Sequence, residues 1–214
     1  MTKKEKVEQI LLLLREQYGP TKCYLDHENP WQLLVATILS AQCTDDRVNI
    51  VTKDLFQKYK SIKDFAEADL IQLEKDIHST GFYHNKAKNI IACCQKLLTE
   101  YNGQVPSDLE ALTSLAGVGR KTANVVRGNW YGIPSIVVDT HVKRLSNLLG
   151  LTQNQDPVKI EFDLMKIIPE DKWIDINTQL IAHGRKICIA RRPKCNECFL
   201  LSYCTGGQKM QKGK

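Results

Sequence analysis

Apolar residues recur at intervals of three and four along most of the chain, which is the period of an amphipathic α-helix. In the first such segment Val7, Ile10, Leu11 and Leu14 fall on one face, and the pattern stops at Gly19. The same pattern, bounded by glycine, proline, serine or asparagine, continues through 29–42, 45–60, 67–78, 84–102, 107–115, 122–131, 140–149, 157–168 and 173–186. The chain is therefore predicted to be helical nearly throughout.

Three segments refine this prediction. Residues 29–42 begin with Asn29, suited to an N-cap, and Pro30, suited to the first helical position, and the apolar run that follows predicts a central buried helix. Only Ser135–Asp139, with the sequence SIVVD, resembles a β-strand, and one short strand cannot form a sheet. The last residues, 206–214, are predicted to be a frayed basic tail. The predicted fold class is all-α.

Composition limits the kind of protein. The 214 residues, of which 43% are hydrophobic, are enough for one large domain or two small ones. No apolar run reaches membrane-spanning length, and Ile10–Leu14, the longest near the N-terminus, lacks the cleavage site of a signal peptide. We therefore expect no membrane partner and a cytoplasmic location. The net charge of +6 favours anionic partners, although a charge of this size often serves only to keep a protein soluble.

The stretch LAGVGRKTANVV, Leu115–Val126, joins two predicted helices through Gly117, Val118 and Gly119. Glycines let the backbone approach a partner closely, and the N–H groups and dipole at a helix start suit a DNA phosphate. Such a contact positions a duplex without reading its sequence. A plain corner between two helices also explains the glycines. A nucleotide triphosphate is not expected, because the spacer between the glycines is too short for a phosphate loop and the turn follows a helix.

Charged residues follow this turn. Arg120 and Lys121 stand where the next helix begins, and the positive end of the helix dipole there favours a neutral, nucleophilic amine over an ammonium ion. Lys121 is therefore a candidate for Schiff-base chemistry at a sugar carbon. Asp139 ends the strand-like segment at a predicted helix start, where an N-cap role is expected. The same carboxylate could also stabilise a cationic sugar as a base departs.

The eight cysteines fall into two groups. Four are scattered among apolar helical residues and are predicted to be small buried side chains: Cys23, Cys43, Cys93 and Cys94. Four crowd the C-terminal part with the spacing C-x6-C-x2-C-x5-C: Cys188, Cys195, Cys198 and Cys204. Clustered thiols in a cytoplasmic protein indicate a metal site, and this spacing fits zinc and a [4Fe–4S] cluster equally well. Arg191, Arg192 and Lys194 lie within the first spacer and predict a second phosphate contact.

Three stretches, LAGVGRKTANVV, VDTHV and HGRKICIARRPKCNECFLLSYC, together resemble the endonuclease III family. These are bifunctional DNA glycosylase/AP lyases of the helix-hairpin-helix superfamily that remove oxidised pyrimidines. The resemblance spans roughly residues 5–204 and includes LLVATILSAQCTDDRVN, which is similar to the family's helix near the damaged base. It implies that the hairpin binds the DNA backbone, that Lys121 is the nucleophile supported by Asp139, and that the four C-terminal cysteines hold [4Fe–4S].

The resemblance also implies an architecture of two helical lobes with a DNA-binding cleft between them. Residues 23–134 would form a six-helix lobe with the helix-hairpin-helix motif. Residues 1–22 and 135–214 would form the lobe that carries the cluster. Lys121 and Asp139 would then face each other from different lobes.

Two further residues map onto positions at which the family disrupts the duplex. Gln42 matches the residue that fills the space left by the extruded nucleotide. Phe82 stands where an aliphatic wedge is more usual, a departure that bears on the preference for the opposite base. Phe82 also has the simpler interpretation of an ordinary buried aromatic residue.

The expected partner is double-stranded DNA with oxidised pyrimidines or abasic sites, bound by a monomer in the bacterial nucleoid without a nucleotide triphosphate. Three other interpretations stay open. Adenine-mismatch glycosylases share the hairpin and the cluster, but they lack a lysine at position 121 and carry an extra C-terminal domain. A monofunctional alkylation glycosylase is disfavoured by Lys121. A non-enzymatic iron–sulfur protein that binds DNA is the third.

Overall fold

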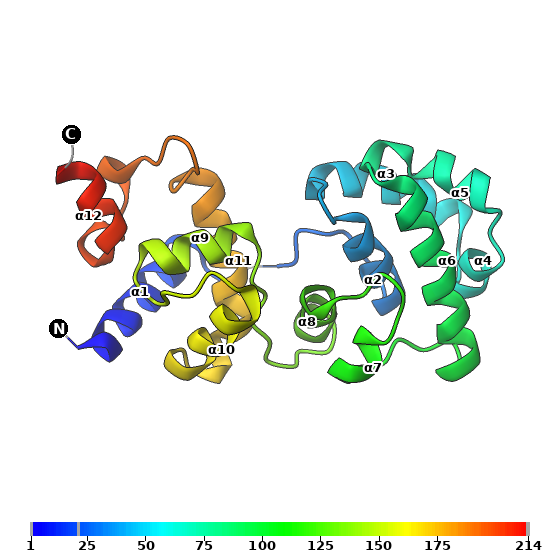
Figure 1. Ribbon diagram of the computed structural model, residues 1–214, viewed down its shortest axis with the longest axis horizontal. Helices are drawn as coiled ribbons and strands as arrows, with labels where there is room; N and C mark the ends of the chain where they lie inside the picture. Colours follow the sequence, from blue (N-terminus) through cyan, green and yellow to red (C-terminus); the bar gives the residue numbers. More distant parts are fainter. Residues whose placement is uncertain (1, 21, 213–214) are drawn as a thin grey trace. The chain divides into compact units, whose positions relative to one another are not determined.

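The computed structural model describes residues 2–20 and 22–212, and every regular element in these ranges is a helix. The chain divides into two compact units. One is continuous, Cys23–Ile133, and the other combines Met1–Lys22 with Pro134–Lys214. Figure 1 shows both units as groups of helices. The prediction of an all-α fold is confirmed.

The strand-like segment Ser135–Asp139 is extended but pairs with no strand in the described ranges. Within those ranges no helix is both long enough and apolar enough to cross a membrane.

The continuous unit is built around α2. Its elements are α2 (Pro30–Leu39), α3 (Asp45–Lys58), α4 (Ile62–Ala66), α5 (Leu70–Asp76), the 3-10 helix η1 (His78–Thr80), α6 (Tyr83–Glu100), α7 (Leu109–Thr113) and α8 (Arg120–Asn129). Every side chain from Gln32 to Leu39 is buried, and α2 packs against α3, α6 and α8. Asn29 caps the helix by accepting a 3.0 Å hydrogen bond from the Gln32 N–H. The predicted central helix is confirmed.

The pattern of apolar residues does not predict α4. Five residues are too few to show the helical period, yet Ile62, Phe65 and Ala66 are buried and the helix packs along α6. The Ser61 hydroxyl caps it by accepting from the Asp64 N–H at 3.1 Å. The described residues of this unit therefore form seven α-helices, where six were expected.

The second unit packs the N-terminal helix against the C-terminal part of the chain. Its elements are α1 (Lys3–Tyr18), α9 (Thr140–Leu148), α10 (Pro157–Ile167), the 3-10 helix η2 (Glu170–Lys172), α11 (Trp173–Lys186), the 3-10 helices η3 (Cys195–Glu197) and η4 (Leu201–Tyr203), and α12 (Thr205–Lys212). The helix α11 packs against both α1 and α9. On α1, Val7, Ile10 and Leu14 are buried and Leu11 is half-buried, as the apolar face predicts.

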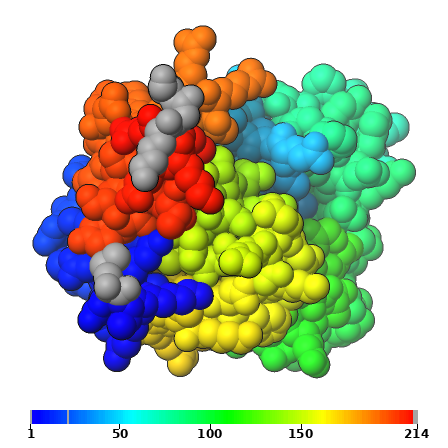
Figure 2. Space-filling model, turned by 60° about the vertical axis from the view of Figure 1, so that its left-hand side comes forward, coloured from blue at the N-terminus to red at the C-terminus, as the bar shows by residue number. Residues whose placement is uncertain are grey.

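The prediction of a frayed tail is wrong for residues 206–212, which belong to α12 (Figure 2, red). The Thr205 hydroxyl donates to the Leu148 carbonyl at 3.1 Å. A Cβ atom on Gly206 would stand 2.5 Å from a Leu148 methyl group, so this glycine allows close packing on α9. The sequence pattern was misleading because a glycine that allows two helices to pack closely cannot be distinguished, from sequence alone, from a glycine that ends a helix. Residues 213 and 214 of the predicted tail lie outside the described residues.

The scattered cysteines follow the prediction only in part. Cys93 and Cys94 on α6 are buried, and burial raises the pKa of both thiols, that of Cys93 to about 12. Cys23 and Cys43 are only half-buried, because they lie in the segments before and after α2 and not within a helix. The prediction of buried side chains is wrong for these two residues.

Candidate functional site

The hairpin between α7 and α8 packs so closely that a side chain in place of one of its glycines would be strained. Gly117 has φ +74°, and a Cβ atom there would stand 2.8 Å from the Cβ of Asn89 on α6. The adjacent Val118 is buried, and its N–H donates to the Leu115 carbonyl at 3.1 Å. The turn is therefore rigid and fixed to the unit's core.

The second glycine opens the start of α8. Gly119 is the N-cap residue, and it has no side chain that could accept hydrogen bonds from the N–H groups of the first turn. The Gly119 carbonyl accepts a hydrogen bond from the Ala123 N–H. A Cβ atom on Gly119 would meet nothing within 4 Å, so the space beside this helix start is open. A helix start that has no side-chain cap and opens into free space is suited to an anion, because the helix dipole favours negative charge there.

Lys121 belongs to this open helix start. The helix begins at Arg120, two residues earlier than the apolar pattern predicts, so Lys121 is its second residue. Its side chain is exposed, whereas Arg120 is half-buried. The structure thus brings the hairpin residues 117–121 together in one turn, with an exposed amine beside the backbone donors.

Gln42 and Phe82 have unusual backbone conformations. Both are in the left-handed region, with φ of 54° and 49°, and among the described non-glycine residues only Asn102 shares this property. Left-handed conformations of such residues cost of order 1 kcal/mol or more and concentrate at functional sites. The Phe82 side chain is 61% exposed, so its interpretation as a buried aromatic residue is wrong.

Asp139 lies at the start of α9 in the other unit. Its Oδ1 accepts a 2.7 Å hydrogen bond from the Val142 N–H, so the predicted N-cap is confirmed. This bond fixes the carboxylate and leaves the second oxygen out of the cap.

A buried asparagine on α11 explains the strand-like segment before Asp139. The Asn177 side chain accepts from the Val137 N–H at 3.0 Å and donates to the Ser135 carbonyl at 2.9 Å. One amide thus takes the place of a neighbouring strand, which is why an extended segment exists without a sheet. Asn177 thereby holds the backbone that delivers Asp139.

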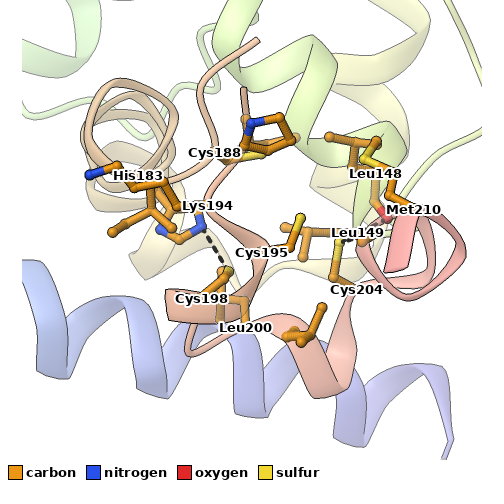
Figure 3. A pocket seen from close by; sticks show the side chains of 15 residues that line it. Leu148, Leu149, His183, Cys188, Lys194, Cys195, Cys198, Leu200, Cys204 and Met210 are labelled. Atoms are coloured by element: carbon orange, nitrogen blue, oxygen red, sulfur yellow. Dashed lines mark hydrogen bonds between the residues drawn. The ribbon is translucent and has the colours of Figure 1, made fainter. Parts of the chain in front are cut away.

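The four C-terminal cysteines surround one pocket after the end of α11 (Figure 3). The pocket is otherwise lined mainly by apolar side chains of α9 and of the cysteine-bearing segment, among them Leu145, Leu149 and Leu200. On α9, Arg144 donates from Nη2 to the Cys188 carbonyl at 2.6 Å. The four thiols therefore line one pocket, with Cys204 buried and the other three half-buried.

The arrangement of these thiols bears on which metal they fit. Four thiolates around one zinc ion each lie about 2.3 Å from it, hence within about 4 Å of one another. In the described ranges no three histidine, cysteine or acidic side chains are grouped closely enough to hold one ion. A [4Fe–4S] cluster is larger and binds its four thiolates further apart. The four thiols that line this pocket are the donor set that a [4Fe–4S] cluster requires.

Burial raises the pKa of the Cys188 and Cys198 thiols. Binding of metal by these groups would therefore release protons.

Three cations accompany the cysteines. Arg191 and Arg192 are exposed, and Lys194 lies 4.0 Å from Glu197, at the limit of an ion pair. An exposed ion pair at this distance contributes little to stability, so Lys194 can exchange it for another anion. All three positive charges are therefore available to a polyanion.

The candidate residues are distributed over both units. Gln42, Phe82 and the hairpin with Lys121 belong to Cys23–Ile133, whereas Asp139 and the cysteines belong to the other unit.

Comparison with known proteins identifies the family. The family model described as HhH-GPD superfamily base excision DNA repair protein matches residues 35–170, and the iron–sulfur binding domain of endonuclease III matches residues 188–204. The endonuclease III of Synechocystis sp. is 51% identical over 97% of this chain and 95% of its own length. The chain belongs to the endonuclease III family.

Two solved structures of the family are similar over the whole chain. One is a non-covalent endonuclease III–DNA complex, with a TM-score of 0.95 and 44% identity over 99% of this chain and all of that one. The other is a trapped endonuclease III–DNA covalent intermediate, an estranged-adenine complex, with a TM-score of 0.94, the same identity and the same coverage. This member of the family is a base-excision DNA glycosylase with AP lyase activity, it binds DNA, and its cofactor is a [4Fe–4S] cluster.

The family position decides the choice between zinc and iron–sulfur that the cysteine spacing leaves open. The matched iron–sulfur domain begins at Cys188 and ends at Cys204, the first and last of the clustered cysteines. The interpretation as a non-enzymatic DNA-binding protein is likewise replaced by that of an enzyme.

Sequence reasoning missed three polar residues around these sites: the half-buried Arg144 and the buried Asn177 and His183. Their partners are distant in the sequence, because Asn177 bonds residues 135 and 137 and His183 contacts Tyr18. A polar residue on the apolar face of a predicted helix was the available signal, since such a group needs an internal partner.

Proposed function

We propose that this enzyme removes oxidised pyrimidines from duplex DNA through a Schiff base on Lys121 and then cuts the strand by β-elimination. The observation that supports this most directly is the exposed amine of Lys121 at a helix start whose backbone donors have no cap of their own. A phosphate held by those donors would bring the neighbouring sugar to the amine.

The DNA backbone would be held at two places. The hairpin residues Gly117, Val118, Gly119 and Arg120 would bind one phosphate through the open helix start. Arg191, Arg192 and Lys194 would bind another through charge. Both contacts are independent of sequence, as an enzyme that searches for damage at any position requires.

The damaged nucleotide must leave the base stack before it can react, at a cost of a few kcal/mol that is lowest for weakened pairs. We propose that the Gln42 and Phe82 side chains offset this cost by filling the space that the nucleotide leaves in the base stack. Their left-handed backbone and the exposure of Phe82 support this assignment, because both project from turns beside helix ends. A phenyl ring offers a stacking surface, whereas an aliphatic wedge offers only volume.

The reaction then follows from the amine and a carboxylate. The Lys121 amine attacks the sugar C1′, the C1′–N bond breaks, and the base leaves with the bonding electron pair and takes up a proton. The C1′–O4′ bond then breaks as the lysine nitrogen forms a double bond to C1′, and the ring oxygen becomes a hydroxyl. The imine that forms acidifies C2′; loss of a C2′ proton expels the 3′ phosphate and cuts the strand 3′ to the lesion. Asp139 would stabilise the cationic sugar and accept or deliver protons, with its rotamer fixed by the N-cap bond.

The cluster would be held by Cys188, Cys195, Cys198 and Cys204. It would link the parts of the cysteine-bearing segment through metal bonds, and through that segment it would support the cations 191, 192 and 194. Nothing in the proposed reaction requires a nucleotide triphosphate. The enzyme would act as a monomer on chromosomal DNA in the bacterial cytoplasm.

Reduction with borohydride tests the proposal. The protein is mixed with a duplex that carries one oxidised pyrimidine, and borohydride is added during turnover. A Schiff base is converted to a stable amine, so a protein–DNA adduct is expected, and its peptide map should place the link at Lys121. A monofunctional adenine-mismatch or alkylation glycosylase would release a base without an adduct, and that result would contradict the proposal.

A further inference from the structure

A buried imidazole contacts the cysteine-bearing segment. His183 on α11 is 2% exposed, and its Nε2 lies 3.4 Å from the Sγ of Cys198 (Figure 3, dashed line). Its Nδ1 lies 3.0 Å from the hydroxyl oxygen of Tyr18, the last residue of α1. Both ring nitrogens of His183 are therefore engaged, one by a proposed cluster ligand and one by a phenol.

The chemistry of the ligand sets the direction of both hydrogen bonds. A cysteine that binds iron is a thiolate and has no proton to donate, so Nε2 must donate to it. A neutral imidazole carries one N–H, so Nδ1 is then the acceptor. The Tyr18 hydroxyl must therefore donate to Nδ1. The order of donation runs from Tyr18 through His183 to Cys198.

Packing holds this chain of hydrogen bonds in place. The Phe199 ring lies against both rings, with centroid distances of 6.0 Å to Tyr18 and 5.1 Å to His183. One turn earlier on α11, Gln179 is also buried and donates to the Gly19 carbonyl at 2.9 Å. Two buried side chains of α11 thus fasten the end of α1, and the imidazole has little freedom to turn away from the sulfur.

We propose that Tyr18 and His183 are positioning residues that fix the Cys198 side chain and raise the reduction potential of the cluster. A hydrogen bond to a ligand sulfur stabilises the reduced cluster more than the oxidised one, because the reduced cluster carries more negative charge. This inference rests on the proposed assignment of Cys198 as a cluster ligand.

The chain supplies other donors that cannot be tested by substitution. The Cys204 sulfur accepts from the Gly207 backbone N–H at 3.2 Å, and every replacement of Gly207 except proline would keep that donor. His183 is therefore the side chain through which the effect can be removed.

The experiment compares the purified, cluster-containing protein with His183→Leu, His183→Gln and Tyr18→Phe. Iron content and visible absorption first establish that each variant has assembled its cluster. The midpoint potential of each is then measured by voltammetry on an electrode. We expect His183→Leu to lower the potential and His183→Gln, which keeps an amide N–H at a similar reach, to recover part of it. Tyr18→Phe should lower it by less.

Tyr203→Phe is the matched control. It removes a tyrosine hydroxyl next to Cys204 for which no hydrogen bond is observed in the described structure, so the potential should not change. An unchanged potential in fully assembled His183→Leu would overturn the proposal, as would an equal shift in Tyr203→Phe. Should His183→Leu fail to assemble its cluster, an unchanged potential in Tyr18→Phe would overturn it instead.

A separate variant distinguishes failure of this inference from failure of the ligand assignment. Cys198→Ser should lose iron or show an altered cluster spectrum. A wild-type iron content and spectrum in that variant would refute the assignment of Cys198 itself.

Discussion

Two helices of this protein begin in opposite ways. At the start of α9 the Asp139 carboxylate accepts from the Val142 N–H, so the chain supplies its own anion. At the start of α8 Gly119 supplies none, and the space beside it is open. Both helix starts have backbone N–H groups that cannot bond within the helix. The α9 start orients a carboxylate with its donors, whereas we propose that the α8 start binds a ligand with them.

The largest effect is expected at the open helix start. Lys121→Gln should reduce base release and strand cleavage by at least about 10³-fold, because glutamine has no nucleophilic amine. Binding to an abasic-site duplex should stay within about threefold, since the backbone donors remain. Single-turnover assays and binding titrations measure the two effects. Lys63→Gln, at an exposed lysine of α4, is the control and should leave both unchanged. Borohydride trapping at the wild-type level in Lys121→Gln would refute the assignment.

The next effect is expected at the capped helix start. Asp139→Asn should slow single-turnover base excision by roughly 10²-fold while the melting temperature holds, because asparagine caps a helix about as well as aspartate. The variant separates the two roles of this residue, since only the charge is lost. An excision rate within about a factor of two of wild type would show that Asp139 is only a helix cap and has no role in the reaction.

A smaller effect, on folding, is expected inside the hairpin. Gly117→Ala should destabilise the protein by about 1–3 kcal/mol, because a Cβ atom at this positive φ would stand 2.8 Å from Asn89. Thermal or urea unfolding measures the loss. Gly119→Ala is the matched control, with a φ of −88° and open space around it, and should change stability far less. Equal stability of the two variants would show that the tight contact does not exist.

The smallest effect is expected from a substitution that makes the start of α8 resemble the start of α9. Gly119→Asp gives α8 the cap that α9 has, so stability should rise by a few tenths of a kcal/mol. The new carboxylate would repel a phosphate at the same donors, and binding to an abasic-site duplex should weaken about tenfold at low salt. Gly119→Asn supplies a cap without charge and should weaken binding less. Unaltered binding in Gly119→Asp would mean that no phosphate lies at the start of α8.

Local features of the sequence predicted much of this structure. The apolar face of α1, the cap at Asn29 and the cap at Asp139 depend on residues within one or two turns, and the chain adopts them as predicted. The spacing of the clustered cysteines likewise located the pocket. The choice between zinc and iron–sulfur came from family resemblance and then from comparison, because spacing alone does not fix the distance between sulfurs.

Features that depend on distant contacts were not predictable in this way. The Asn177 side chain makes the hydrogen bonds to Ser135 and Val137 that a neighbouring strand would otherwise make, although these residues precede it by about 40 positions. His183 contacts Tyr18, which lies near the N-terminal end of the sequence. The helix α12 was missed because Gly206 is explained only by its contact with Leu148. The exposure of Phe82 follows from a left-handed backbone that no periodic pattern reveals.

The discontinuous unit has a consequence for how the protein is made. The helix α1 leaves the ribosome before the continuous unit, but α9 and α11, which complete its apolar surroundings, follow only after the whole of Cys23–Ile133. At about 5–20 residues per second, this wait lasts for several seconds, during which the continuous unit can fold. The apolar face of α1 then depends on chaperones or on its own charged residues for solubility. Closure of the second unit is thus a late event in biosynthesis.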